Sequence, residues 1–180
     1  LIEDIKPSFF EATVALAFDY FAKEEVDFAI IEVGLGGRLD STNVISPEVC
    51  LITNIGMDHM NLLGDTIQQI ATEKAGIIKS NTPVIISEYT DETKPIFLKK
   101  ALEENAPIIF AADQIKATRE YKDQLHQRIA VTYENQTMIY ELDLRGTYQV
   151  KNIVGVLAVV QELRHQGLKI LDEHIQSALA

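Results

Sequence analysis

The stretch Glu32-Val-Gly-Leu-Gly-Gly-Arg-Leu-Asp-Ser-Thr-Asn43 decides the fold. It begins inside the apolar run at residues 28–33, and an apolar run that enters a glycine turn is typical of a buried strand in a parallel sheet. The glycines allow the backbone to turn sharply or to approach a ligand closely. They form neither a Walker A loop, which needs G-x-x-x-x-G-K-[ST], nor G-x-G-x-x-G, because position 39 is Leu. The stretch therefore predicts a strand end in an α/β sheet, followed by a loop.

Strands and helices alternate on both sides of this stretch. Apolar residues recur at helical spacing over residues 8–24, and short apolar runs between turn residues predict strands. We expect further strands at residues 49–55, 83–87 and 107–110, and further helices at residues 65–75, 93–104, 149–166 and 172–179. Residues 128–133 and 137–142 predict an antiparallel hairpin. The fold class is α/β, with a mostly parallel Rossmann-like sheet flanked by helices and a small antiparallel subregion at residues 112–145.

Three local signals mark helix ends. Ser8-Phe-Phe-Glu11 predicts a capping box, in which the side chains of Ser8 and Glu11 satisfy free N–H groups at the start of the first helix. Asp65 is expected to cap the helix at residues 65–75. Gly76 is expected to end that helix in a left-handed conformation.

Composition and charge restrict the class of protein. The 180 residues suffice for one domain with a sizeable core. The 16 Lys and Arg residues against 27 Asp and Glu residues give a net charge of −11, which argues against binding to nucleic acid or to an anionic membrane. Cys50, the single cysteine, lies in an apolar run and suits a buried thiol in a reduced compartment. We expect a cytoplasmic monomer that binds neither nucleic acid nor membrane.

In open α/β sheets, ligands bind beyond the carboxyl ends of the strands, and three residues near such ends are unusual. Glu32 places a carboxylate in an apolar strand, which is costly unless it binds a cation, points outward or meets an arginine such as Arg38. His59 ends the polar segment after the strand at residues 49–55, and is either a metal ligand or an ordinary loop histidine. Lys74 lies on the apolar stripe of its helix, so it either snorkels to the helix end or is held at a site.

Residues 8–79 resemble the folylpolyglutamate synthase/dihydrofolate synthase family of Mur-type ATP-dependent amide ligases. The likeness is carried, in this order, by Ser8-Phe-Phe-Glu11, the stretch from Glu32 to Asn43, Thr53-Asn-Ile-Gly-Met-Asp-His59, Leu63-Gly64 and Glu73-Lys-Ala-Gly-Ile-Ile-Lys79. A weaker likeness returns at Leu144-Arg-Gly-Thr-Tyr-Gln-Val-Lys-Asn152, where Tyr148 stands in place of the histidine that many members have.

The resemblance implies an ATP-dependent ligase. Members of the family phosphorylate a carboxylate on a folate or dihydropteroate with ATP, and the amino group of L-glutamate then displaces phosphate from the acyl phosphate. Mg²⁺ is implied because the carboxylate and the triphosphate repel each other. By the resemblance, Glu32 and His59 bind the metal, and Lys74 is carbamylated and takes part in catalysis with His59. Gln149 and Asn152 belong to the segment whose asparagine contacts adenine.

The resemblance also bears on domain organisation. It implies that residues 1–180 are the central ATP-binding domain of a Mur-type ligase, a P-loop NTPase-like fold that is incomplete at its N-terminus. The family's P-loop would precede the first helix, so we expect the isolated chain to be inactive and the longer protein to be the enzyme. Two alternatives remain: another Mur-type ligase that acts on a peptidoglycan precursor, and a non-catalytic α/β binding module.

Overall fold

The computed structural model describes residues 5–57, 60–123 and 125–180. It contains a parallel sheet in the order β1 (Cys50–Ile52), β2 (Val84–Ile86) and β3 (Ile108–Phe110). A separate antiparallel sheet has the order β4 (Ile115–Lys122), β5 (Gln127–Tyr133) and β6 (Gln136–Leu142). The expected α/β class with a late antiparallel element is therefore confirmed.

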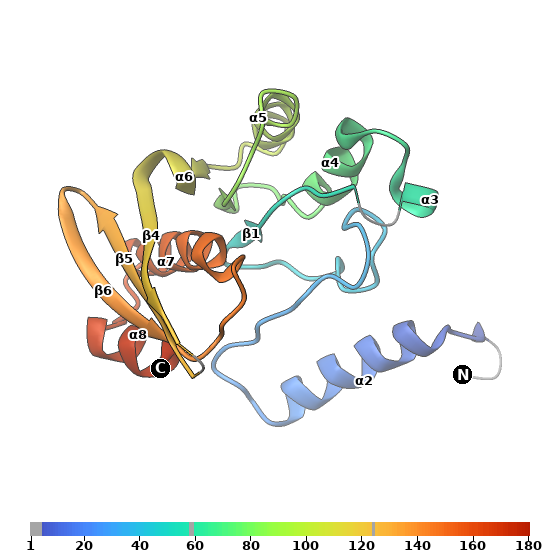
Figure 1. Ribbon diagram of the computed structural model, residues 1–180. Coiled ribbons are helices and arrows are strands. Elements are labelled where there is room, and N and C mark those ends of the chain that lie inside the picture. The colour runs from blue at the N-terminus through green and yellow to red at the C-terminus, as the bar shows by residue number, and fades with distance from the viewer. Residues whose placement is uncertain (1–4, 58–59, 124) are drawn as a thin grey trace.

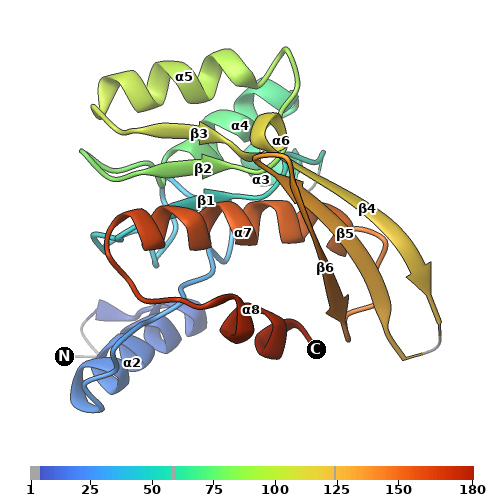
Figure 2. The same cartoon turned by 90° about the vertical axis from the view of Figure 1, so that its left-hand side faces the viewer.

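The described helices are α2 (Phe9–Lys23), α3 (Met60–Leu63), α4 (Ile67–Ala75), α5 (Lys94–Glu103), α6 (Ala111–Gln114), α7 (Gln149–His165) and α8 (Asp172–Leu179). Helices lie on both faces of the parallel sheet, whereas α2 lies apart from it (Figures 1 and 2). Figure 2 shows α4 and α5 on one face of the parallel sheet, α7 on the other, and α8 beside the antiparallel sheet. In the described part of the chain, every helix is too short or too polar to cross a membrane.

Strand β2 lies at the centre of the core because it is buried on both faces. Val84 and Ile86 belong to the hydrophobic cluster that α4 and α5 cover, whereas Ile85 belongs to the cluster that α7 and the antiparallel sheet cover. Successive side chains of a strand point to opposite faces, so three consecutive apolar residues serve both clusters. Full burial of each such side chain contributes roughly 1.5–3 kcal/mol to folding.

Residues 28–33 do not form the strand that the sequence predicted. In the described structure this segment has no ladder partner, and the side chains of Phe28 and Ile30 are 68% and 98% exposed. Glu32 is also exposed. A strand requires a hydrogen-bonded neighbour, and an apolar pattern cannot show whether one is present. The cost assigned to a carboxylate buried in a strand therefore does not apply to Glu32.

The helix ends agree with the sequence in one case and differ in two. The capping box of α2 is confirmed: the N–H of Ser8 donates to Glu11 Oε2 (2.6 Å), and the N–H of Glu11 donates to Ser8 Oγ (3.2 Å). Thr66, not Asp65, caps α4. Gly76 is right-handed, with φ −62°, and its lack of a side chain serves close packing instead, because a Cβ there would lie 2.3 Å from Arg38 Cβ.

The antiparallel sheet has one strand more than the predicted hairpin. Strand β4 carries Lys116, Arg119 and Glu120 among its apolar residues, and its register shifts between Arg119 and Tyr121. Both features hide the alternation of period two by which a half-buried strand is recognised.

Candidate functional site

A cavity of about 250 Å³ lies where the carboxyl end of β1 meets the glycine-rich loop and α4. The glycine-rich loop is defined as residues 34–43. The cavity is lined by Val33, Gly34, Leu35 and Gly36 from the loop and its approach, Asn54 and Gly56 after β1, Leu63 from α3, and Lys74 from α4. Three segments that the sequence singled out therefore meet at one cavity.

Asp40 organises the glycine-rich loop from within. Its carboxylate accepts hydrogen bonds from Leu35 N–H (2.8 Å), from Thr42 N–H (2.9 Å) and from the Thr42 hydroxyl (2.5 Å). Partial burial by itself would raise the pKa of Asp40, but these bonds and one from Gly34 N–H hold its pKa below the usual value. Gly36, with φ +72°, takes the left-handed turn that such a closed loop requires.

Further contacts fix this loop against α4. Arg38 pairs with the Glu73 carboxylate (3.0 Å), and its own N–H donates to the Glu73 carbonyl (2.9 Å). Asn43 Nδ2 donates to the carbonyl of Gly76 (3.0 Å), and Lys79 Nζ donates to the carbonyl of Asn43 (2.8 Å). The sequence did not single out Asn43, Glu73 or Lys79 beyond their place in motifs. Arg38, which was considered as a partner for Glu32, is paired with α4 instead.

The three predicted site residues differ in how they relate to this cavity. Lys74 lines the cavity, is half-buried, and its Nζ makes no hydrogen bond or ion pair with any residue that the structure describes. Glu32 directly precedes the lining residue Val33, and its exposed carboxylate likewise has no partner within the described ranges. His59 lies outside the described residues. The shared metal site of Glu32 and His59 therefore stays a prediction.

Gln149 and Asn152 lie in the first turn of α7, where Asn152 Nδ2 donates to Gln149 Oε1 (3.1 Å). They do not line the cavity, but their turn lies at the same edge of the parallel sheet. Lys151 pairs with Glu88 (2.7 Å), the second residue after β2, and Glu88 N–H donates to the carbonyl of Thr53 after β1 (3.1 Å). The first turn of α7 and the cavity are thus linked through the residues that follow β1 and β2.

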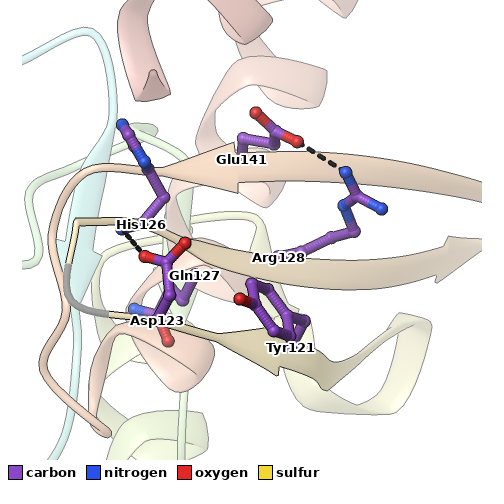
Figure 3. Close-up of a pocket in the computed structure, with 6 residues that line it drawn as sticks. All are labelled: Tyr121, Asp123, His126, Gln127, Arg128 and Glu141. Atoms are coloured by element: carbon purple, nitrogen blue, oxygen red, sulfur yellow. Dashed lines mark hydrogen bonds and ion pairs between the residues drawn. The ribbon is translucent and has the colours of Figure 1, made fainter.

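A second cavity of about 260 Å³ lies on the antiparallel sheet (Figure 3). It is lined by Tyr121, Asp123, His126, Gln127, Arg128 and Glu141. Its carboxylates already have partners: Glu141 pairs with Arg128 (2.7 Å), and Asp123 accepts from the N–H groups of His126 and Leu125, which lower the pKa of Asp123. These contacts join β5 to β6 and hold the Asp123 carboxylate against the main chain of residues 125 and 126.

The glycine-rich loop, the polar segment after β1 and the lysine on α4, set at one edge of a parallel sheet, define a class of protein. Residues 8–160 match the model of the Mur ligase middle domain, and the chain belongs to this family. Within it, the chain is a homologue of the folylpolyglutamate synthase/dihydrofolate synthase enzymes.

Three relatives illustrate the likeness. The dihydrofolate synthase/folylpolyglutamate synthase of Bacillus subtilis (strain 168) is 36% identical over 184 residues, which cover 97% of this chain and 41% of that protein. The apo form of the L. casei folylpolyglutamate synthase has a TM-score of 0.88 at 30% identity, over 95% of this chain and 42% of that chain. A complex of a folylpolyglutamate synthase with AMPPCP and folate has a TM-score of 0.86 at 30% identity, over 93% of this chain and 42% of that chain. The chain thus spans about two fifths of these proteins.

Proposed function

We propose that the protein carrying this chain is an ATP-dependent ligase that adds L-glutamate to a folate or dihydropteroate through an acyl phosphate. Residues 1–180 would supply part of its nucleotide site. The observation that carries the proposal is that Lys74, Asn54 and the glycine-rich loop line one and the same cavity. Support also comes from the related synthase whose structure holds an ATP analogue and folate.

The cavity has the chemistry that a polyphosphate requires. Glycine-loop N–H groups and an amide side chain can donate to phosphate oxygens, and a glycine backbone permits close approach. Gln149 and Asn152, at the same sheet edge, would hold the adenine by their amide groups. These residues bind and orient the nucleotide at the edge where open α/β sheets bind ligands.

Glu32 would hold Mg²⁺ together with His59. The Glu32 carboxylate fits this role because it has no partner among the described residues and adjoins the cavity lining. Bound Mg²⁺ supplies positive charge that lets a substrate carboxylate approach the triphosphate.

Lys74 would act as a carbamate. Its amine, free of hydrogen bonds to described residues, would form an N–C bond with carbon dioxide and release one proton. The resulting anion would orient the metal or its waters from α4. This role accounts for a lysine on the inner side of the helix.

Replacement of Lys74 in the full-length protein tests the proposal. We expect Lys74→Ala to reduce folate- and glutamate-dependent phosphate release by roughly 100-fold or more, because the anion that orients the metal or its waters would be lost. Lys74→Glu should recover part of the activity because it restores an anion. Lys99→Ala is the matched control, since Lys99 is a highly exposed lysine on α5 with only a distant ion pair to Glu103 (3.9 Å). Wild-type turnover in Lys74→Ala would refute the proposal.

A further inference from the structure

The side chain of Gln127, at the start of β5, is completely buried and uses both ends of its amide. Its Oε1 accepts a hydrogen bond from Arg119 Nε on β4 (2.9 Å). Its Nε2 donates to the carbonyl of Leu144 and to the carbonyl of Gly146 (3.3 Å). A buried amide is costly to leave unpaired, so these bonds fix where the two carbonyls lie.

Both carbonyls belong to the loop that connects β6 to α7, which we call the 143–148 connection. Most of its residues are exposed, including Leu144 (57%) and Tyr148 (62%), so apolar burial does little to hold it. Arg119 adds a long hydrogen bond from Nη2 to the carbonyl of Thr147 (3.4 Å). Gln127 and Arg119 together therefore tie the antiparallel sheet to this connection.

The hydrogen bonds from Gln127 to the 143–148 connection are linked directly to the start of α7. The carbonyl of Gly146, which accepts from Gln127, also accepts from the N–H of Gln149, the first residue of α7 (3.1 Å). The N-cap residue Tyr148 provides no side-chain cap, and its carbonyl accepts from the N–H of Asn152 (3.0 Å). A helix start without its own cap depends on outside contacts for its geometry.

The rest of α7 is held differently. Ile153, Val154 and Gly155 are buried against the sheets, and a Cβ on Gly155 would lie 2.9 Å from Ser87 Oγ. The helix from residue 153 onward is therefore fixed by packing. Its first turn, with Gln149 and Asn152, is held by the 143–148 connection together with the Lys151–Glu88 pair (2.7 Å) and the hydrogen bond from Ser87 Oγ to the carbonyl of Lys151 (3.4 Å).

We propose that Gln127 is a positioning residue for the nucleotide base. By fixing the 143–148 connection, it sets Gln149 and Asn152 in the orientation that recognises adenine. The inference rests on the proposed function, because it assumes that these two amides contact the base. Gln127 itself belongs to the antiparallel sheet, and its effect would pass through hydrogen bonds to the main chain.

The test compares ATP with ITP, which differs at the 6-position of the purine, in the full-length protein. We expect Gln127→Leu to raise KM for ATP roughly five- to tenfold with kcat within about twofold of wild type, as loss of ground-state binding should. KM for L-glutamate should stay unchanged, and the preference for ATP over ITP in kcat/KM should fall toward one. Gln127→Glu, which can still accept from Arg119 but cannot donate to the carbonyls, should behave in the same way and serves if the leucine variant does not fold.

Two further variants separate the possible outcomes. Val131→Ala, which weakens the core of the same sheet at a residue 4% exposed, should lower stability and leave the ATP/ITP preference intact. Asn152→Ala should reduce the preference, and a result with no change there would overturn the proposed base contact. A reduced preference in Asn152→Ala combined with a wild-type preference in both Gln127 variants would overturn the role of Gln127 alone.

Discussion

Replacing Asp40 by Asn should loosen the glycine-rich loop by a predictable amount. One carboxylate oxygen accepts from Leu35 N–H, and the other accepts from the N–H and hydroxyl of Thr42. The asparagine keeps one acceptor and turns an NH₂ group toward the other donor. A hydrogen bond to a charged group contributes about 1.5–3 kcal/mol, so for a partly buried loop we expect a loss of about 1–2 kcal/mol. The backbone amide that loses its acceptor should then exchange roughly 5- to 30-fold faster.

Amide hydrogen exchange in the full-length protein measures this effect at Leu35 and Thr42. Because the pKa of Asp40 is lowered in the folded state, its contribution to stability is present above the usual value of 3.8 and is lost as the pH falls through the folded pKa. The difference between wild type and variant should therefore be full at pH 7 and shrink below about pH 3.8. Asp19→Asn, which removes only an exposed pair with Lys23, is the control. Equal exchange in wild type and Asp40→Asn at pH 7 would refute the reasoning.

Three other outcomes can be checked. Gly76→Ala should lower the unfolding temperature, because the added Cβ would clash with the Arg38 backbone (2.5 Å to its Cα). Such overpacking costs about 1–3 kcal/mol, more than the helix preference of alanine contributes, so an unchanged or higher unfolding temperature would contradict the packing. Burial raises the pKa of the Cys50 thiol to about 11, so iodoacetamide should not modify it at pH 8 until the protein is unfolded, and rapid native alkylation detected by mass spectrometry would show otherwise. Glu32→Gln should raise the Mg²⁺ concentration that gives half-maximal activity about tenfold, and the control Glu25→Gln should leave it unchanged. If wild type and Glu32→Gln need the same Mg²⁺ concentration, Glu32 does not bind the metal.

Much of the fold follows from local patterns. The apolar runs around β1, β2 and β3 and the helical periodicity between them predict alternating strands and helices. They do so because apolar side chains on both faces of these strands pack into the two hydrophobic clusters. The same rule failed at residues 28–33, since an apolar run carries no information about its ladder partner. It also missed β4, where charged residues and a bulge interrupt the alternation.

Site residues could be predicted where they belong to short sequence motifs. Lys74 was singled out as a polar residue on an apolar helix stripe, and it lines the cavity together with Asn54 of the polar segment after β1. The role of Asp40 could have been found from the Asp-Ser-Thr sequence, because an Asp side chain commonly accepts from the N–H two residues later. Gln127 could not, since its partners lie 17 and 19 residues away and meet it only after the antiparallel sheet forms.

Hydrogen exchange with and without Mg²⁺ and AMPPCP tests the central claim most directly, namely that the cavity around Lys74 holds the nucleotide's phosphates and the first turn of α7 holds its base. In the full-length protein, we expect the nucleotide to slow exchange at residues 33–36, 54–57 and 149–152, and to leave residues 136–141 of strand β6 unchanged. Unchanged exchange in the first three segments, or slowing confined to residues 136–141, would contradict the account.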